Sequence, residues 1–264
     1  MTQIVLSGLL LGTIVGLLAG LLGIGGGLII VPVLAYLLST LLDIPAAETI
    51  VIAIATSLST IIFTGMSSTL AHYRLGNLNR NIVCWCGFGI ALGAVVGAQI
   101  AIAISGQTLK QIFALLVFLI AIYMIFGSRR VSDNIATNQG LSLIGVSTGI
   151  LSALIGIGGG ALLVPALIWY RVDIRQAIGC AAFSGIIIAV FGTASFILSG
   201  WHYGDTFNGF IGFVYWPATL GIVITSVVTA PIGARLGQGM NTQWLKRVFA
   251  VFLILVSIRM LWGL

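Results

Sequence analysis

Two stretches of the chain, Ile82 to Ile104 and Gln111 to Phe126, contain no charged residue. A helix needs roughly 20 mainly apolar residues to cross the core of a bilayer, and these stretches approach or reach that length. Only 6% of all residues are charged, whereas soluble domains carry about 25%. The apolar stretches also lack the alternation of a membrane β-barrel. We therefore predict an all-α polytopic membrane protein.

Several function classes are excluded by what the sequence lacks. The longest polar segment, residues 128–139, is too short for an ATPase or any other soluble domain. The net charge is +6, but the basic residues are scattered at the ends of apolar stretches, so they indicate membrane topology rather than nucleic-acid binding. No HExxH motif and no pair of intramembrane carboxylates indicates an enzyme. The sequence predicts no cofactor and no metal site, and Cys84, Cys86 and Cys180 are expected to be small buried apolar residues.

An internal repeat is the strongest pattern in the chain. Residues 16–34 read GLLAGLLGIGGGLIIVPVL, and residues 149–167 read GILSALIGIGGGALLVPAL. Weaker matches follow in the same order, such as His72-Tyr73 with His202-Tyr203 and Gly97-Ala98 with Gly233-Ala234. The chain therefore divides into a first transmembrane repeat at residues 1–127, a linker at 128–139 and a second repeat at 140–264.

Each repeat contains five apolar segments that we expect to be helical. They cover residues 4–22, 27–42, 46–71, 81–105 and 108–127 in the first repeat, and 141–156, 160–170, 175–200, 208–234 and 243–262 in the second. The first two segments of each repeat are short and are joined by the glycine run. They could form one broken span, a re-entrant hairpin or two short spans.

The distribution of Lys and Arg favours one arrangement of these segments. If each glycine-linked pair returns to the side it entered from, the second repeat is inverted relative to the first. Nine basic residues then share one face, namely Arg74, Arg80, Arg129, Arg130, Arg171, Arg175, Arg235, Lys246 and Arg247, and two lie on the other, Lys110 and Arg259. The positive-inside rule accordingly predicts inverted-topology repeats with a cytoplasmic linker and both termini outside. Such repeats are typical of secondary transporters.

The two glycine runs are the candidate binding site. Three adjacent glycines permit a break in the helix, and the helix that resumes presents free N–H groups and a positive dipole end to the break. Such a helix start can bind an anion without a buried Lys or Arg. We predict that Gly25, Gly26 and Gly27 and their counterparts Gly158, Gly159 and Gly160 bind substrate, with hydroxyl donors from Thr56 and Ser57. The alternative is that these glycines only allow close helix packing, as expected of Gly8, Gly12, Gly16 and Gly20.

Three further residues are candidates for coupling or gating. Glu48, near the start of the third segment, is either a helix-start acid or a proton carrier. His72 and His202 end equivalent segments and are predicted to lie on opposite membrane faces. There they either gate the pathway or sense protons, or they anchor the chain at the interface. In the second repeat the counterpart of Thr56 and Ser57 is degraded or shifted to Ser184.

The tandem GIGGG motifs followed by Val-Pro, the ATSLS stretch at 55–59, AHYRLGN at 71–77 and PIGARLG at 231–237 resemble the TauE/SafE family of sulfite exporters. The resemblance covers nearly the whole chain. It implies a multi-pass inner-membrane permease for a small anion such as sulfite, an organosulfonate or thiosulfate, working by alternating access and driven by an ion gradient of protons or sodium. The alternatives are a passive anion channel and a permease for a small organic anion without sulfur. The resemblance leaves the substrate, the direction of transport and the oligomeric state open.

Overall fold

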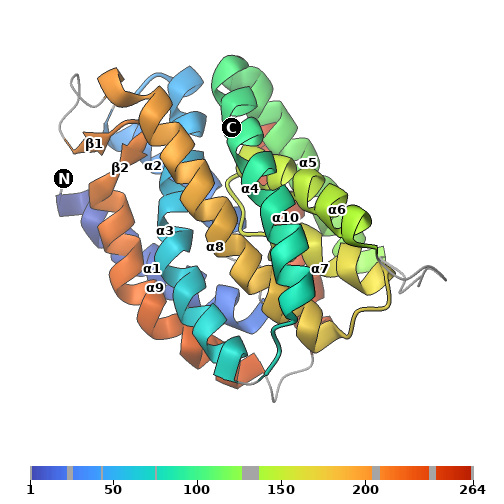
Figure 1. Ribbon diagram of the computed structural model, residues 1–264. Coiled ribbons are helices and arrows are strands. Elements are labelled where there is room, and N and C mark those ends of the chain that lie inside the picture. Colours follow the sequence, from blue (N-terminus) through green and yellow to red (C-terminus); the bar gives the residue numbers. More distant parts are fainter. Residues whose placement is uncertain are drawn as a thin grey trace.

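The computed structural model describes residues 2–22, 26–42, 44–74, 76–126, 137–203, 209–237 and 242–262. These ranges are predominantly helical (Figure 1). The helices of the first repeat are α1 (Thr2–Leu22), α2 (Gly27–Leu41), α3 (Ala46–Arg74), α4 (Arg80–Ala103) and α5 (Gly106–Phe126). Those of the second are α6 (Asn138–Leu154), α7 (Gly160–Trp169), α8 (Ile174–Ser199), α9 (Trp216–Gly237) and α10 (Thr242–Trp262), with a short 3-10 helix η1 (Trp201–Tyr203) after α8.

The segment predicted at 208–234 differs from the structure at its start. Residues before Trp216 form a hairpin of strands β1 (Phe210–Ile211) and β2 (Val214–Tyr215), so the fold is not entirely helical. Gly209 and Gly212 have φ values of 91° and 58°, a conformation that glycine adopts without the steric cost of a Cβ. Pro217 then lies in the first turn of α9, where its missing N–H costs no helix bond. The other predicted segments agree with the observed helices to within a few residues.

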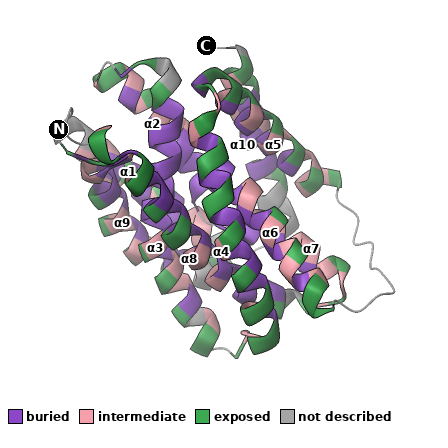
Figure 2. Ribbon diagram, turned by 45° about the horizontal axis from the view of Figure 1, so that its top comes forward, coloured by how far each residue is buried: buried purple, intermediate pink, exposed green. Residues whose placement is uncertain are grey.

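Five helices in the described part of the chain are long and apolar enough to cross a membrane: α3, α4, α5, α8 and α9. In the apolar stretch of α3, 78% of the residues are buried inside the protein, whereas the corresponding share in the other four helices is 33% to 50%. The third helix is therefore the central one (Figure 2). In contrast, α7 has 10 residues and is about 15 Å long, half of a bilayer core of about 30 Å.

Glycine contacts hold α1 against α9 and α6 against α4. A Cβ on Gly8 would lie 3.3 Å from the Cα of Gly221, and one on Gly16 would lie 2.7 Å from the Cα of Ser226. In the other pair, a Cβ on Gly149 would lie 2.7 Å from the carbonyl oxygen of Ile90. The first helix of each repeat thus packs on the fourth helix of the other, on opposite sides of the molecule (Figure 1). The predicted packing role of Gly8, Gly12 and Gly16 is confirmed.

The order of these contacts gives the directions of the helices. Contacts advance together along α1 and α9, from Gly8 near Gly221 to Gly16 near Ser226, so these helices run parallel. The third helices, α3 and α8, run in opposite directions, because Gly65 contacts Ile186 while Leu58 contacts Gly192.

The expectation that all three cysteines are buried is wrong for Cys84. Cys86 and Cys180 are buried, and the Cys86 thiol lies 3.3 Å from the carbonyl oxygen of Leu141 on α6. Cys84 precedes Cys86 by two residues on the same helix, which is about 200° around the axis. Its side chain is therefore on the outer face of α4 and is exposed.

Substituting the packing glycines is expected to destabilise both helix pairs. A Cβ at Gly12 would overlap the carbonyl of Ile222, and one at Gly149 would press on the backbone of Ile90. Because backbone cannot move aside as a flexible side chain does, we expect Gly12→Ala and Gly149→Ala each to lower the free energy of unfolding by about 1–3 kcal/mol. Thermal unfolding in detergent measures this. Leu10→Ala, at a residue that is 67% exposed, is the control, and a glycine variant as stable as this control would contradict the packing role.

Candidate functional site

The described parts of the two glycine runs contact each other. Gly27 is the first residue of α2, and a Cβ on it would overlap the carbonyl oxygen of Gly156 and lie 2.9 Å from the Cα of Ile157. Gly156 itself has a φ of +64°, which disfavours a residue with a side chain. Gly26 is buried against Val15, and Gly25 lies outside the described residues. The structure therefore joins two motifs that are far apart in the sequence.

Hydroxyl groups of α3 hold this junction in place. Ser57 Oγ donates a hydrogen bond of 2.9 Å to the carbonyl oxygen of Gly156, and Thr56 Oγ1 accepts one of 3.0 Å from the backbone N–H of Tyr215. Both side chains are fully buried. In this conformation Ser57 thus positions the second glycine turn and Thr56 positions the β-hairpin.

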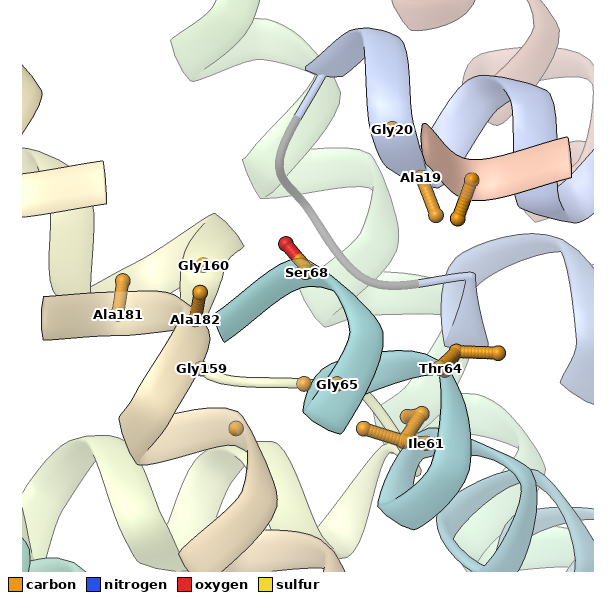
Figure 3. Close-up of a pocket in the computed structure, with 13 residues that line it drawn as sticks. Ala19, Gly20, Ile61, Thr64, Gly65, Ser68, Gly159, Gly160, Ala181 and Ala182 are labelled. Atoms are coloured by element: carbon orange, nitrogen blue, oxygen red, sulfur yellow. The ribbon is translucent and has the colours of Figure 1, made fainter. Parts of the chain in front are cut away.

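A small cavity of about 40 Å³ adjoins the second glycine turn. Its walls come from α1, from Thr64 and Ser68 on α3, from Gly158, Gly159 and Gly160, and from the first half of α8 (Figure 3). A water molecule needs about 10–15 Å³ by a comparable measure, so the cavity has the scale of a few waters or one small ion. None of the described residues that line it is charged.

The start of α7 supplies polar backbone groups to this cavity. The N–H groups of Leu162 and Leu163 bond to the carbonyl oxygen of Gly159 at 3.3 and 2.8 Å. The preceding N–H groups, those of Gly160 and Ala161, are the ones that a helix start leaves without a partner inside the helix. The positive end of the α7 dipole also lies here. Such a helix start can stabilise an anion without a cationic side chain.

Ser184 on α8 is a buried hydroxyl beside the same turn. Its Cβ would lie 3.6 Å from a Cβ on Gly159, and its Oγ has no hydrogen-bond partner within the described ranges. The sequence offers Ser184 as the shifted counterpart of Thr56 and Ser57, the alternative being that this counterpart is degraded. An unused buried donor at this point adds to the polar character of the turn.

A row of hydroxyls along α3 was missed in the sequence. Thr49, Thr56, Thr60, Thr64 and Ser68 follow one another at intervals of seven, four, four and four residues, which places them along one stripe of a helix. The first four have side chains that are at most 7% exposed. The signal was available as a spacing pattern of Ser and Thr in the third segment, but hydroxyls that bond to their own helix backbone are common enough to obscure it.

Glu48 lies at the start of α3, away from the glycine turns. Its side chain is exposed and accepts a 2.7 Å hydrogen bond from the hydroxyl of Tyr203 in η1. Burial, and then the hydrogen bond and charge of Glu48, raise the pKa of Tyr203 above its usual value. Eight residues separate Glu48 from Thr56, about 12 Å along the helix. The carboxylate therefore does not contact the candidate site in this conformation.

The two histidines do not come together. His72 is in the last turn of α3, whereas His202 is next to Tyr203, which contacts Glu48 in the first turn of the same helix. From Glu48 to His72 the helix rises about 36 Å. A direct interaction between His72 and His202 is therefore not part of this structure.

Comparisons with known proteins agree on a membrane transporter. The model of the sulfite exporter TauE/SafE family matches residues 8–260. A probable membrane transporter protein of Haemophilus influenzae is 38% identical, with 96% of each chain covered. Relatives named as probable membrane transporter proteins also occur in Bacillus subtilis (YunE, 27% identical, 96% of this chain and 95% of the relative) and Methanocaldococcus jannaschii (26%, 96% and 94%). No solved structure matches the chain significantly.

Proposed function

Because the chain belongs to the sulfite exporter TauE/SafE family of multi-pass membrane proteins, we propose that it is a secondary transporter of a small sulfur-containing anion. The observation that carries the proposal is the junction of the two glycine turns, next to a cavity lined by Gly158, Gly159 and Gly160. Sulfite, thiosulfate or an organosulfonate would bind there through helix-start N–H groups and hydroxyls.

Electrostatics supports an anion in preference to a cation. The part of the cavity wall that the structure describes contains no carboxylate, and the α7 start directs partial positive charge toward it. A hydrogen bond to a charged group contributes about 1.5–3 kcal/mol, so several such contacts are needed to offset the cost of removing an ion from water. The N–H groups of Gly160 and Ala161 together with the Ser184 hydroxyl are candidates for these contacts.

Alternating access by two inverted repeats is the mechanism we propose. The opposite directions of α3 and α8, and the exchange of partners between first and fourth helices, support this arrangement. Exchange of conformations between two similar halves would expose the glycine junction first to one side of the membrane and then to the other. The proposed location is the cytoplasmic membrane, with both termini outside.

Counterflow in proteoliposomes tests the proposed function. Vesicles preloaded with unlabelled sulfite, thiosulfate or sulfoacetate should accelerate the entry of the same labelled anion, because a carrier returns loaded faster than empty. A passive channel gives no acceleration. Acceleration by acetate with none by the sulfur anions would instead identify a permease for organic anions without sulfur.

Glu48 is the residue we propose for proton coupling, and Tyr203 provides its control. We expect Glu48→Gln, which removes the titratable group but keeps an acceptor for Tyr203, to abolish accumulation driven by a pH gradient and to spare counterflow. Tyr203→Phe removes the hydrogen bond but keeps the carboxylate, so accumulation should persist. Measured pH dependence that is equal in Glu48→Gln and the parent would leave Glu48 as a helix-start residue that anchors η1.

A further inference from the structure

A second and larger cavity lies along α2, beyond the glycine junction. Its volume is about 440 Å³, within the range of roughly 300–1,000 Å³ typical of small-molecule sites. It is bordered by α2 from Pro32 to Ser39, by the start of α3, by the start of α5 and by the second half of α10. The wall residues of α2 begin at Pro32 and end at Ser39, five to twelve residues beyond Gly27 in the glycine junction. These positions are about 8–18 Å from Gly27 along the helix.

Two basic residues border this cavity, Lys110 and Arg259. They are the two that the sequence predicts on the membrane face opposite the other nine. Lys110 comes from α5 and Arg259 from the last turn of α10. The Arg259 guanidinium carbon lies 5.0 Å from the ring centroid of Tyr36, also in the wall. This cation–π contact holds the guanidinium group against α2. Two residues distant in the sequence thus bring positive charge to a single cavity.

The described residues that border the cavity bring basic side chains to it but no acidic ones. No Asp or Glu is among the described residues that border the cavity. The nearest acid along the chain is Glu48, the neighbour of Thr49, and its carboxylate accepts the hydrogen bond from Tyr203. Lys and Arg offer three and five N–H donors, and the guanidinium fork matches the oxygens of a sulfonate, phosphate or carboxylate.

The cavity also lies on the line of α3 hydroxyls. Thr49 borders it, and Thr64 and Ser68 of the same row border the small cavity beside the second glycine turn. Thr56 and Thr60 occupy the stretch between them. The two cavities are therefore at opposite ends of one polar stripe on the central helix.

We propose that the larger cavity is an oxyanion-binding vestibule, in which Lys110 and Arg259 hold the charged group of an anion before it reaches the glycine junction. The entry role rests on the proposed transport function, whereas oxyanion binding does not. The bound oxyanion has two potential sources, the transported anion itself and the phosphate of an anionic lipid head group. A sulfonate and a phosphate both present negatively charged oxygens on a tetrahedral sulfur or phosphorus atom.

Binding to the purified, delipidated protein distinguishes these sources. Sulfoacetate, dihexanoyl phosphatidylglycerol and dihexanoyl phosphatidylcholine are titrated separately by calorimetry. We expect sulfoacetate affinity to fall about tenfold or more for each charge removed in Lys110→Gln and Arg259→Gln. The conservative pair Lys110→Arg with Arg259→Lys should restore most of it. The control pair Arg74→Gln with Arg80→Gln removes the same net charge from exposed positions at the other end of the bundle and should bind like the parent.

Each outcome bears on a separate part of the proposal. Phosphatidylglycerol binding that depends on Lys110 and Arg259, without sulfoacetate binding, would support the oxyanion site and overturn its entry role. If Lys110→Gln and Arg259→Gln bind every ligand with the affinity of the parent, the oxyanion site is overturned. A parent protein that binds sulfoacetate through Lys110 and Arg259 but shows no counterflow would refute the transport function alone. Gly159→Val should retain the binding that depends on Lys110 and Arg259, because the two cavities share no described lining residue.

Discussion

Gly159→Val is expected to abolish anion transport in a protein that still folds. A Cβ at Gly159 would lie 3.1 Å from the terminal methyl of Ile188 and 3.6 Å from the carbonyl oxygen of Ala181, so the added side chain needs only a small shift of a flexible neighbour. It would fill space beside the start of α7 and block access to the N–H groups of Gly160 and Ala161. Two lost contacts of about 1.5–3 kcal/mol each correspond to an affinity about 100-fold lower or more.

The matched control for this variant is Gly87→Val. A Cβ at Gly87 would lie 2.9 Å from the terminal methyl of Ile187, the residue next to Ile188 on α8. Gly87 borders neither described cavity. Both variants therefore press on an isoleucine methyl of the same helix, but only one does so at the glycine turn. Uptake of labelled sulfite and thermal unfolding are measured for both, and transport by Gly159→Val equal to that by Gly87→Val would reduce Gly159 to a packing glycine.

Gly27 is unsuitable for the same experiment. Its Cβ would overlap the carbonyl of Gly156 on the opposite turn, so even alanine forces two backbone segments apart. Loss of transport in Gly27→Ala would be inseparable from loss of the junction. The two glycine turns thus share a sequence motif but differ in what their glycines contact.

The helices were predictable because lipid imposes a simple requirement. A chain in hydrocarbon must satisfy its backbone groups within helices, so the apolar runs alone located α3, α4, α5 and α8 to within a few residues. The β-hairpin before α9 escaped this reasoning. Phe210 and Tyr215 are buried like the residues of a membrane helix, and the positive φ values of Gly209 and Gly212 that bend the chain are not distinguishable in a sequence rich in glycine.

The candidate site was predictable only where the motif repeats. The GIGGG runs pointed to Gly158, Gly159 and Gly160, which border a cavity in the structure. The hydrogen bond from the Ser57 hydroxyl to the carbonyl oxygen of Gly156 joins residues 99 positions apart. The sequence alone could not predict it. Likewise, Lys110 and Arg259 come together because α5 and α10 pack side by side. The distribution of basic residues predicted only that these two lie on the same face of the membrane.

Thiol labelling is expected to place the loop between α4 and α5 outside and the start of α6 inside. Gln107 in the first turn of α5 and Gln139 in the first turn of α6 are both exposed. The expectation rests on the split of nine basic residues against two, and it agrees with the opposite directions of α3 and α8. Cys84 is replaced by Ser, since it is the exposed native cysteine, while Cys86 and Cys180 are buried.

In intact cells, an impermeant maleimide should label Gln107→Cys and leave Gln139→Cys unlabelled. Membrane permeabilisation should then expose Gln139→Cys to the reagent, which shows that the thiol is reactive and shielded only by the bilayer. The reverse pattern would invert the whole orientation but keep the antiparallel repeats. Labelling of both positions from outside would contradict the inverted arrangement itself, because α5 would then begin on the side where α6 begins. Alternating access by exchange of two inverted halves would lose its structural basis.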